Sequence, residues 1–328
     1  MILLLLSDSI KHLDQIKHGL TAVFDMKDLG DPNFILGMRI VRDEKDNSIS
    51  ICQDEYIKQV VKRFGLEDAS PTTMVPMNPG LKLCKTGVID QPEAPKVDAK
   101  EYQRAIGSLM YAMIGTRPDI AFAVGKLAQY SSDPRKPHRE ALDQVLRYLS
   151  RTRKFGLKYQ CGDDIQEDAT LSAFSDADWG GCLDTRRSTT AFLIMISGAL
   201  VNWKSKKQAS VTCSTCEAEY IAASDTSREV LSWRMLLAEI GYDMSAPTML
   251  YCDNQSAIAL TKDDVHHQRT KHIDIRYHFI RELVNRKEIK LDYLDTDSMI
   301  ADLLTKPLDP RRHAMLMAMI GMVEVIQG

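Results

Sequence analysis

The hydrophobic and polar positions of the first half of the chain predict helices and one small hairpin. Apolar residues recur at steps of three and four over 9–23, 53–64, 102–116, 117–130 and 134–149, a spacing typical of helices with one buried face. Residues 34–41 alternate between apolar and polar, and 48–52 returns after a turn as the second arm of a β-hairpin. The apolar run at residues 1–6 predicts a buried strand, because it is too short for a signal peptide and lacks the basic flank.

The second half has a different pattern. Three strands are predicted first, one beginning at residue 171, one over 191–196 and one beginning at 201, and a long helix over 217–240 follows them. A strand over 249–252, two helices of which the second spans 272–286, a strand over 289–294 and a short helix over 299–305 complete the pattern. Three antiparallel strands followed by two strands that alternate with helices predict an α/β domain, with a mixed five-stranded sheet and helices on both faces.

Length and composition are those of an ordinary globular protein. The 328 residues allow about two domains, and 44% hydrophobic with 27% charged residues are enough for a buried core. No apolar run reaches membrane-spanning length, and seven cysteines, an odd number, suit reduced thiols in an intracellular protein, cytoplasmic or nuclear. With a net charge of −3, any basic surface for nucleic acid must be local.

Four acidic residues of the second half stand in apolar surroundings: Asp176, Glu219, Asp253 and Asp302. An unpaired buried carboxylate is unfavourable by several kcal/mol or takes up a proton, so four in one domain predict a common cationic partner. Carboxylate oxygens from separate elements suit Mg²⁺ or Mn²⁺, and two such ions would serve phosphodiester hydrolysis. The pair Cys213-x-x-Cys216 has no second pair of ligands and does not predict a zinc site.

The predicted elements bring these carboxylates towards one edge of the sheet. Asp176 and Asp253 come at the ends of two strands, where the sites of open α/β sheets gather. Glu219 lies on the apolar stripe of the long helix and points at the sheet, whereas Glu217, about 200° away around the helix, faces solvent. Simpler interpretations stay open for two of them: Glu219 as a charge that complements the helix dipole, and Asp302 as a capping or surface residue.

Basic residues flank the predicted edge. The candidates for contacts with a sugar-phosphate backbone are Lys204, Lys206, Lys207, Arg269, Lys271, His272 and Arg276. The first three follow a strand, and the others surround the start of a helix. For any one of them a solvated charged surface is the simpler interpretation, but as a group they indicate a nucleic-acid interface.

Seven sequence blocks of the second half follow one another in a specific order. They include Phe174-Ser-Asp-Ala-Asp-Trp179, Trp203-Lys-Ser-Lys-Lys-Gln208, Asp253-Asn-Gln-Ser-Ala-Ile258 and Ala301-Asp-Leu-Leu-Thr-Lys-Pro307. Together these blocks resemble the ribonuclease H domain of copia-type LTR retrotransposon polyproteins. In the first half, Gly107-Ser-Leu-Met-Tyr111 and Thr116-Arg-Pro-Asp-Ile-Ala121 resemble the downstream part of the copia-type reverse transcriptase.

This resemblance has implications for fold and activity. It implies a ribonuclease H-like domain over 170–328, preceded by an α+β remnant of a reverse transcriptase, with the end of the palm and a thumb-like region over 1–68 and a linker and helical connection region over 69–160. It implies that Asp176, Glu219, Asp253 and Asp302 are catalytic metal ligands. It also implies that the substrate is an RNA/DNA hybrid whose RNA strand is cut, and that the chain works with the remainder of a polyprotein.

Three interpretations of function stay open. The first is a metal-dependent endoribonuclease that cuts RNA in hybrids. The second is a catalytically silent, nucleic-acid-binding relic of a retrotransposon. The third is another nuclease of the same fold, such as a junction resolvase or transposase, which would prefer DNA. The paired aspartates of the polymerase would precede the residues that match 1–4, so an N-terminally truncated, polymerase-inactive reverse transcriptase portion is expected.

Overall fold

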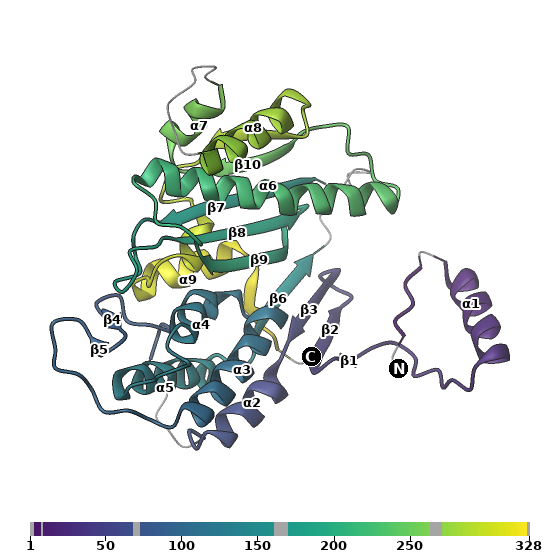
Figure 1. Cartoon of the computed structure of the whole chain (residues 1–328). Helices are drawn as coiled ribbons and strands as arrows, with labels where there is room; N and C mark the ends of the chain where they lie inside the picture. Colours follow the sequence, from purple (N-terminus) through teal and green to yellow (C-terminus); the bar gives the residue numbers. More distant parts are fainter. Residues whose placement is uncertain (1–2, 8, 68–72, 161–169, 263–270, 327–328) are drawn as a thin grey trace.

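The computed structural model describes residues 3–7, 9–67, 73–160, 170–262 and 271–326, with only the backbone at 260–262, 271–275 and 277. Within these residues there are two five-stranded sheets and one two-stranded sheet. The C-terminal sheet and its helices occupy one side of the molecule, and the helices of the first half occupy the other, with the first sheet beside them (Figure 1).

The C-terminal sheet confirms the predicted mixed, five-stranded arrangement. Its strands are β7 Leu171–Asp178, β8 Thr189–Ile196, β9 Ala199–Lys207, β10 Thr248–Cys252 and β11 Ile289–Tyr293, in the order β11-β10-β7-β8-β9. β7, β8 and β9 pair antiparallel, whereas β10 pairs parallel with both β7 and β11. Because β7 and β10 are parallel, their carboxyl ends lie at the same edge of the sheet. The strand order also changes direction between these two strands, and sites of such sheets form at this point.

Helices cover both faces of this sheet, as predicted. α6 Thr215–Glu239, α7 Gln255–Lys262 and α8 Lys271–Asn285 pack on one face, over a core that includes Ala173, Ile194 and Ile280. The 3-10 helix η2 Ile300–Leu304 and helices α4 Ala121–Ala128 and α9 Pro310–Met319 lie on the other face, where Leu193 and Leu304 belong to a second core.

The first half is mainly helical, in agreement with its hydrophobic pattern. The helices that pack together there are α2 Asp54–Arg63, α3 Ala99–Gly115, the 3-10 helix η1 Pro118–Ile120, α4, and α5 Lys136–Arg151. They share one core, which includes Ile57, Leu109 and Leu146. The Asp98 carboxylate accepts hydrogen bonds from two backbone N–H groups at the start of α3, which fixes where this helix begins. Between α2 and α3, β4 Leu83–Cys84 and β5 Gly87–Val88 form a small hairpin.

The first sheet joins the two halves of the chain. Its strands are β1 Phe34–Ile35, β2 Met38–Asp43, β3 Ser48–Cys52, β6 Phe155–Gln160 and β12 Met322–Glu324, in the order β1-β2-β3-β6-β12. β1 to β3 contain the predicted hairpin, but the hydrophobic pattern did not predict β6 or β12. β12 pairs antiparallel with β6, with Met322 opposite Leu157. The last strand of the chain therefore completes a sheet that begins in the first half.

The N-terminal segment differs in part from its prediction. α1 Ile10–Val23 is the predicted helix, but none of its residues is buried, and it stands apart from the rest of the molecule (Figure 1). The buried strand expected at residues 1–6 is wrong for residues 3–6, which are not in a strand and include Leu6 at 85% exposure. A strand needs neighbours for its backbone hydrogen bonds, and no described strand pairs with this segment.

None of the described helices combines the length and the apolar character that crossing a membrane requires.

Candidate metal centre and nucleic-acid interface

Asp176 lies on β7, the central strand of the C-terminal sheet, and is 1% exposed. The Thr305 hydroxyl donates a hydrogen bond to its Oδ2 atom, and Lys306 Nζ lies 3.5 Å from the same oxygen. Its other oxygen, Oδ1, is buried and has no hydrogen-bond partner among the described residues. A buried carboxylate oxygen without a partner is unfavourable, which makes this atom a candidate ligand for a cation.

Glu219 points from α6 to the sheet, and this predicted orientation is confirmed. Its side chain is 5% exposed, and it accepts a hydrogen bond of 3.2 Å from the backbone N–H of Ala177 on β7. Glu217 instead serves the start of the helix, because its carboxylate accepts a hydrogen bond of 2.7 Å from the Cys213 N–H, while the Ser214 hydroxyl accepts one from the Glu217 N–H. This reciprocal cap holds the first turn of α6 in place and so positions Glu219.

Asp253 directly follows β10 and is half-buried. The Thr296 hydroxyl donates a hydrogen bond of 3.3 Å to its Oδ2 atom. The preceding residue, Cys252, is fully buried on the α6 side of the sheet. Glu219, Cys252 and Asp253 each offer one ligand atom, and these three atoms lie within 4.8 Å of one another. The sequence predicted the two carboxylates of this group but not the thiol.

Asp302 lies in η2, on the face of the sheet opposite α6, and is 4% exposed. It pairs with two cations: Lys306 Nζ is 2.6 Å from Oδ1, and Arg312 Nη2 is 3.7 Å from Oδ2. Lys306 therefore bridges the carboxylates of Asp302 and Asp176. Sequence reasoning missed both basic residues, although the four-residue spacing of Asp302 and Lys306, at the end of a short helix, was a usable signal.

The pKa values of the site show that these carboxylates act on one another. Burial raises the pKa of Glu219 well above its ordinary value, and the negative charges of Asp176 and Asp253 raise it further. Burial and then Asp176 likewise raise the pKa of Asp302. Burial alone would lower the pKa of Lys306, but the carboxylates of Asp176 and Asp302 outweigh it and raise that pKa. Asp176 thus interacts electrostatically with Glu219 on one face and with Asp302 on the other.

The donor set fits a hard divalent cation. Glu219 and Asp253 bring their carboxylates together with Cys252 within 4.8 Å, whereas Asp176 and Asp302 do not belong to this group. Carboxylate oxygens are the ligands that Mg²⁺ and Mn²⁺ prefer. The buried Oδ1 atom of Asp176 has no other partner among the described residues. The repulsion that raises the pKa of Glu219 is the kind of excess negative charge that a bound cation relieves.

The raised pKa of Glu219 predicts a pH-dependent effect of its replacement in metal-free protein. Because the folded state has the higher pKa, the contribution of Glu219 to stability is fully present below its ordinary pKa of 4.5 and is lost as the pH rises through the raised value. Glu219→Gln removes this loss. Urea unfolding from about pH 5 to about pH 8 should therefore show the variant gaining free energy of unfolding relative to wild type as the pH rises. A difference that does not change with pH would contradict this account.

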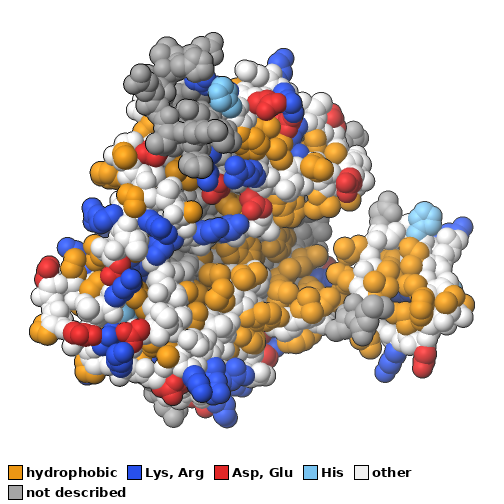
Figure 2. Space-filling view, viewed as in Figure 1, with side chains coloured by type: hydrophobic (Ala, Val, Ile, Leu, Met, Phe, Trp, Pro, Cys, Tyr) orange, Lys and Arg blue, Asp and Glu red, His pale blue; other side chains and the backbone are white. Residues whose placement is uncertain are grey.

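The predicted basic residues do not form one group. Lys204 pairs with Glu229 of α6 at 3.4 Å, and Lys206 is exposed nearby on β9. Lys207 instead donates a hydrogen bond of 2.9 Å to Gln129 after α4, and Arg276 pairs with Asp225 at 2.6 Å, which ties α8 to α6. Arg269 and the side chains of Lys271 and His272 lie outside the described residues. Figure 2 shows Lys and Arg side chains across the middle of one face, interrupted by acidic and other side chains.

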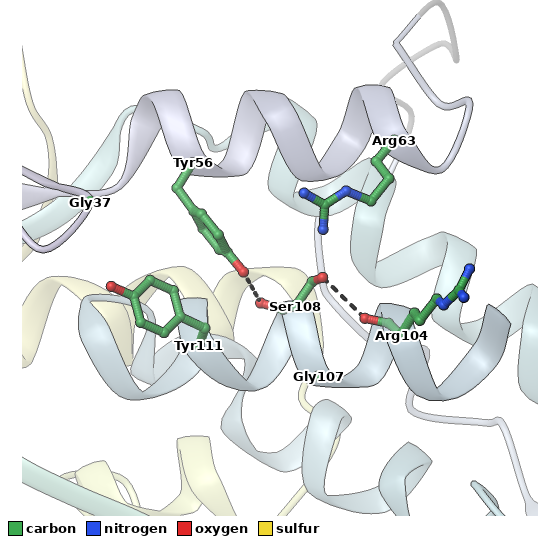
Figure 3. Close-up of a pocket in the computed structure, with 7 residues that line it drawn as sticks. All are labelled: Gly37, Tyr56, Arg63, Arg104, Gly107, Ser108 and Tyr111. Atoms are coloured by element: carbon green, nitrogen blue, oxygen red, sulfur yellow. Dashed lines mark hydrogen bonds between the residues drawn. The ribbon is translucent and has the colours of Figure 1, made fainter. Parts of the chain in front are cut away.

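A surface groove lies between α2 and α3 of the first half (Figure 3). This groove has a volume of about 630 Å³ and is lined by Gly37, Tyr56, Arg63, Arg104, Gly107, Ser108 and Tyr111. The rings of Tyr56 and Tyr111 meet edge to face at 4.9 Å, and the Tyr56 hydroxyl donates to the Ser108 carbonyl at 3.0 Å. Within the described part of the chain, neither Arg63 nor Arg104 has an ion-pair partner. Sequence reasoning did not single out this groove.

Comparison with known proteins assigns the chain a family. The reverse transcriptase (RNA-dependent DNA polymerase) family matches residues 2–79. A retrovirus-related Pol polyprotein from transposon TNT 1-94 of Nicotiana tabacum is 41% identical over 94% of this chain and 23% of its own length. The polyprotein from transposon RE1 of Arabidopsis thaliana is 35% identical over 92% of this chain and 20% of its own. A putative transposon Ty5-1 protein of Saccharomyces cerevisiae is 32% identical over 70% of this chain and 71% of its own.

Solved structures are more distant. LC11-RNase H1 in complex with an RNA/DNA hybrid is 14% identical over 42% of this chain and 94% of its own, with a TM-score of 0.32. The foamy viral protease-reverse transcriptase in complex with an RNA/DNA hybrid is 12% identical over 89% of this chain and 34% of its own, with a TM-score of 0.47. At these scores the assignment of the fold rests on the strand order of the sheet.

The strand order β11-β10-β7-β8-β9, with acidic residues on β7 and directly after β10, defines a ribonuclease H-like domain. The sequence identities assign the chain that contains this domain to a family of longer proteins. The chain belongs to the copia-type retrotransposon Pol polyprotein family. It spans less than a quarter of the length of the TNT 1-94 and RE1 polyproteins, at 23% and 20%.

Proposed function

We propose that this chain hydrolyses the RNA strand of RNA/DNA hybrids, using Asp176, Glu219, Asp253 and Asp302 as ligands for two Mg²⁺ or Mn²⁺ ions. The observation that supports this most strongly is the buried Asp176 carboxylate, which interacts electrostatically with Glu219 and Asp302 and keeps one oxygen without a partner among the described residues. The distant structural neighbours include an RNase H1 and a protease-reverse transcriptase, each solved in complex with an RNA/DNA hybrid. The family to which the chain belongs consists of retrotransposon polyproteins.

The protein residues have distinct proposed roles. Asp176 and Asp253 come from neighbouring parallel strands, and each would contact both cations. Glu219 would be a further ligand of one cation, and Asp302 a further ligand of the other. Divalent ions held by these residues would supply an activated water and would neutralise the leaving oxygen. Thr305 holds the Asp176 carboxylate in place through its hydroxyl. The ribose 2′-hydroxyl would distinguish the RNA strand from the DNA strand.

The assay for this function uses the full chain and an RNA/DNA hybrid labelled on each strand in turn. With Mg²⁺, we expect cleavage of the RNA strand and an intact DNA strand. Duplex DNA and single-stranded RNA of the same sequence serve as controls. No cleavage with either Mg²⁺ or Mn²⁺ would contradict the proposal, and a preference for duplex DNA would favour a nuclease of another class on the same fold.

A second interpretation is a protein that binds hybrids without cutting them. One observation favours it: the Lys306 ammonium bridges Asp176 and Asp302 and so supplies positive charge that a cation would otherwise supply. Hybrid binding in a mobility-shift assay, with no product in the cleavage assay, would support this interpretation over the enzyme. The same result would suit a chain that acts only as part of a larger polyprotein, such as its relatives.

We further propose that the groove between α2 and α3 contacts the sugar-phosphate backbone of the bound hybrid. Arg63 and Arg104 lack ion-pair partners among the described residues and can neutralise phosphates. Tyr56 and Tyr111 offer aromatic surfaces, and the exposed Gly107 has open space where a side chain would stand, so a backbone can approach α3 closely.

Charge reversal in this groove is expected to weaken hybrid binding. In the double variant Arg63→Glu/Arg104→Glu, the slope of log affinity against log salt concentration should fall in magnitude by about 1 per lost phosphate contact. Lys62→Glu/Lys100→Glu changes the same amount of charge on the same two helices, outside the groove, and serves as the matched control. Fluorescence anisotropy at several salt concentrations measures both. Equal losses in the two double variants would show that only net charge matters.

A further inference from the structure

Cys252 occupies an unusual position for a free thiol. It is the last residue of β10 and alternates with Thr248 and Leu250 on the face that α6 covers. Its side chain is fully buried, and its Sγ atom lies 4.0 Å from Glu219 Oε2. Asp253 follows it, and the ligand atoms of Glu219, Cys252 and Asp253 fall within 4.8 Å of one another. The thiol therefore lies directly beside two of the four carboxylates.

We propose that Cys252, Glu219 and Asp253 form a site for thiophilic divalent cations, of the class of Zn²⁺, Co²⁺ and Cd²⁺. A tetrahedral ion with a metal–sulfur bond of about 2.3 Å and a metal–oxygen bond of about 2.0 Å holds these two ligands about 3.5 Å apart. The observed distance of 4.0 Å between Cys252 Sγ and Glu219 Oε2 is close to this sulfur-to-oxygen distance. Small rotations of the two side chains therefore bring both atoms within bonding distance of one ion.

The chemistry of the ligands separates this site from a magnesium site. Mg²⁺ gains nothing from a thiol, because it prefers hard oxygen ligands, whereas Zn²⁺, Co²⁺ and Cd²⁺ bind thiolate and carboxylate together. On binding, the S–H bond of Cys252 breaks, its electron pair stays on sulfur and forms the bond to the metal, and the proton passes to the buffer. No atom changes oxidation state.

A second feature, on the neighbouring strand β7, favours a cation close to these three residues. The buried Oδ1 atom of Asp176 has no hydrogen-bond partner among the described residues, and Asp176 lies near enough to act electrostatically on both Cys252 and Glu219. A cation held by Glu219, Cys252 and Asp253 would therefore offset the repulsion between the carboxylates of Asp176 and Glu219.

Occupation of this site by a thiophilic ion has a consequence for activity, which rests on the proposed function. Glu219 and Asp253 are shared between the thiophilic site and the proposed magnesium centre. Zn²⁺ or Cd²⁺ at low concentration would then displace Mg²⁺ and inhibit hybrid cleavage. Replacement of Cys252 by Ser should raise the inhibitory concentration of Zn²⁺ at least roughly tenfold, because even outer-shell partners of metal ligands are worth 10- to 100-fold in affinity.

The test is a Co²⁺ titration of the full chain without Mg²⁺, followed by ultraviolet absorption. A sulfur-to-cobalt charge-transfer band is expected in the wild type and is expected to disappear in both Cys252→Ser and Cys252→Ala. The double variant Cys213→Ser/Cys216→Ser, which removes the other closely spaced thiols, should keep the band. Loss of the band in that double variant, or its survival in the Cys252 variants, would overturn the proposal.

One further measurement keeps the result decisive. X-ray absorption of the wild-type Zn²⁺ complex should show a sulfur neighbour at about 2.3 Å, and a shell of oxygen and nitrogen only would overturn the proposal without any variant. The absorption experiment needs no catalytic activity. An inactive protein with the charge-transfer band would therefore contradict the proposed function alone, and an active protein without the band would contradict the thiophilic site alone.

Discussion

Asp176→Asn is expected to reduce Mg²⁺-dependent cleavage of an RNA/DNA hybrid by about 10³-fold or more. Asn has nearly the same shape, and its side-chain oxygen can still accept the hydrogen bond from Thr305. It lacks the negative charge that a divalent cation requires. The stabilisation of transition-state charge by a bound metal is worth several kcal/mol, and a loss of about 4 kcal/mol corresponds to about 10³-fold in rate. Single-turnover cleavage of a labelled hybrid measures the effect.

Glu217→Gln is the matched control for this experiment. It makes the same kind of change, carboxylate to amide, on a residue that caps α6 and lies outside the proposed metal centre. Its cleavage rate should stay close to that of the wild type. Equal rates for wild type and Asp176→Asn would contradict a metal centre at Asp176, and equal losses in the two variants would indicate a general effect of destabilising the domain.

Arg117→Met is expected to destabilise the whole chain by about 3–5 kcal/mol, because it leaves a buried carboxylate without its cation. Arg117 and Asp119 are both fully buried and pair through two hydrogen bonds of 2.9 and 2.7 Å. Arg117 also donates to Thr152 after α5, and the Tyr148 hydroxyl donates to Asp119 at 2.6 Å. The network therefore joins η1 to α5 in the core of the first half.

The same network reaches the C-terminal domain. The ring of His313 on α9 packs edge to face against the ring of Tyr148, with 5.7 Å between the ring centroids. Arg312, which precedes His313, pairs with Asp302. Because β12 also completes the sheet of β6, we propose that the described residues from β1 onwards unfold as one cooperative unit, across the boundaries predicted between 1–68, 69–160 and 170–328. Urea unfolding followed by tryptophan fluorescence and by far-ultraviolet circular dichroism should then give coincident transitions.

Two controls separate this effect from simple loss of a contact. In Arg117→Met/Asp119→Leu no buried charge is left unpaired, so this variant should be more stable than Arg117→Met alone. Arg286→Met breaks an exposed pair with Glu282 and should change the free energy of unfolding by less than about 1 kcal/mol. Similar, small effects of Arg117→Met and Arg286→Met would show that the buried network does not hold the two halves together.

The features that the sequence predicted well are those with a local periodic signal. The three- and four-residue spacing along α6 separated Glu219, which is buried against the sheet, from Glu217, which caps the helix. The short apolar strand before Asp253 placed this residue at the carboxyl end of β10. These inferences needed only the geometry of one element at a time.

The features that the sequence missed depend on contacts between distant segments. β12 has only three residues, and β6 pairs with β3 and β12, both of which lie more than 100 residues away along the chain, which no local pattern encodes. The bridging position of Lys306 depends on how η2 packs against β7, so the sequence around Lys306 did not reveal its contact with Asp176. The exposed run at Leu3 to Leu6 shows the converse, because apolar character alone did not produce a strand.

The central claim, that four carboxylates gather around divalent cations, is tested most directly by anomalous diffraction from crystals of the full chain grown with Mn²⁺. The account predicts an anomalous peak in contact with Asp176 and Asp253, with Glu219 and Asp302 beside it and Lys306 moved away from Asp176. Peaks found only elsewhere in the molecule, or an unchanged bridge of Lys306 between Asp176 and Asp302 without an ion, would contradict it.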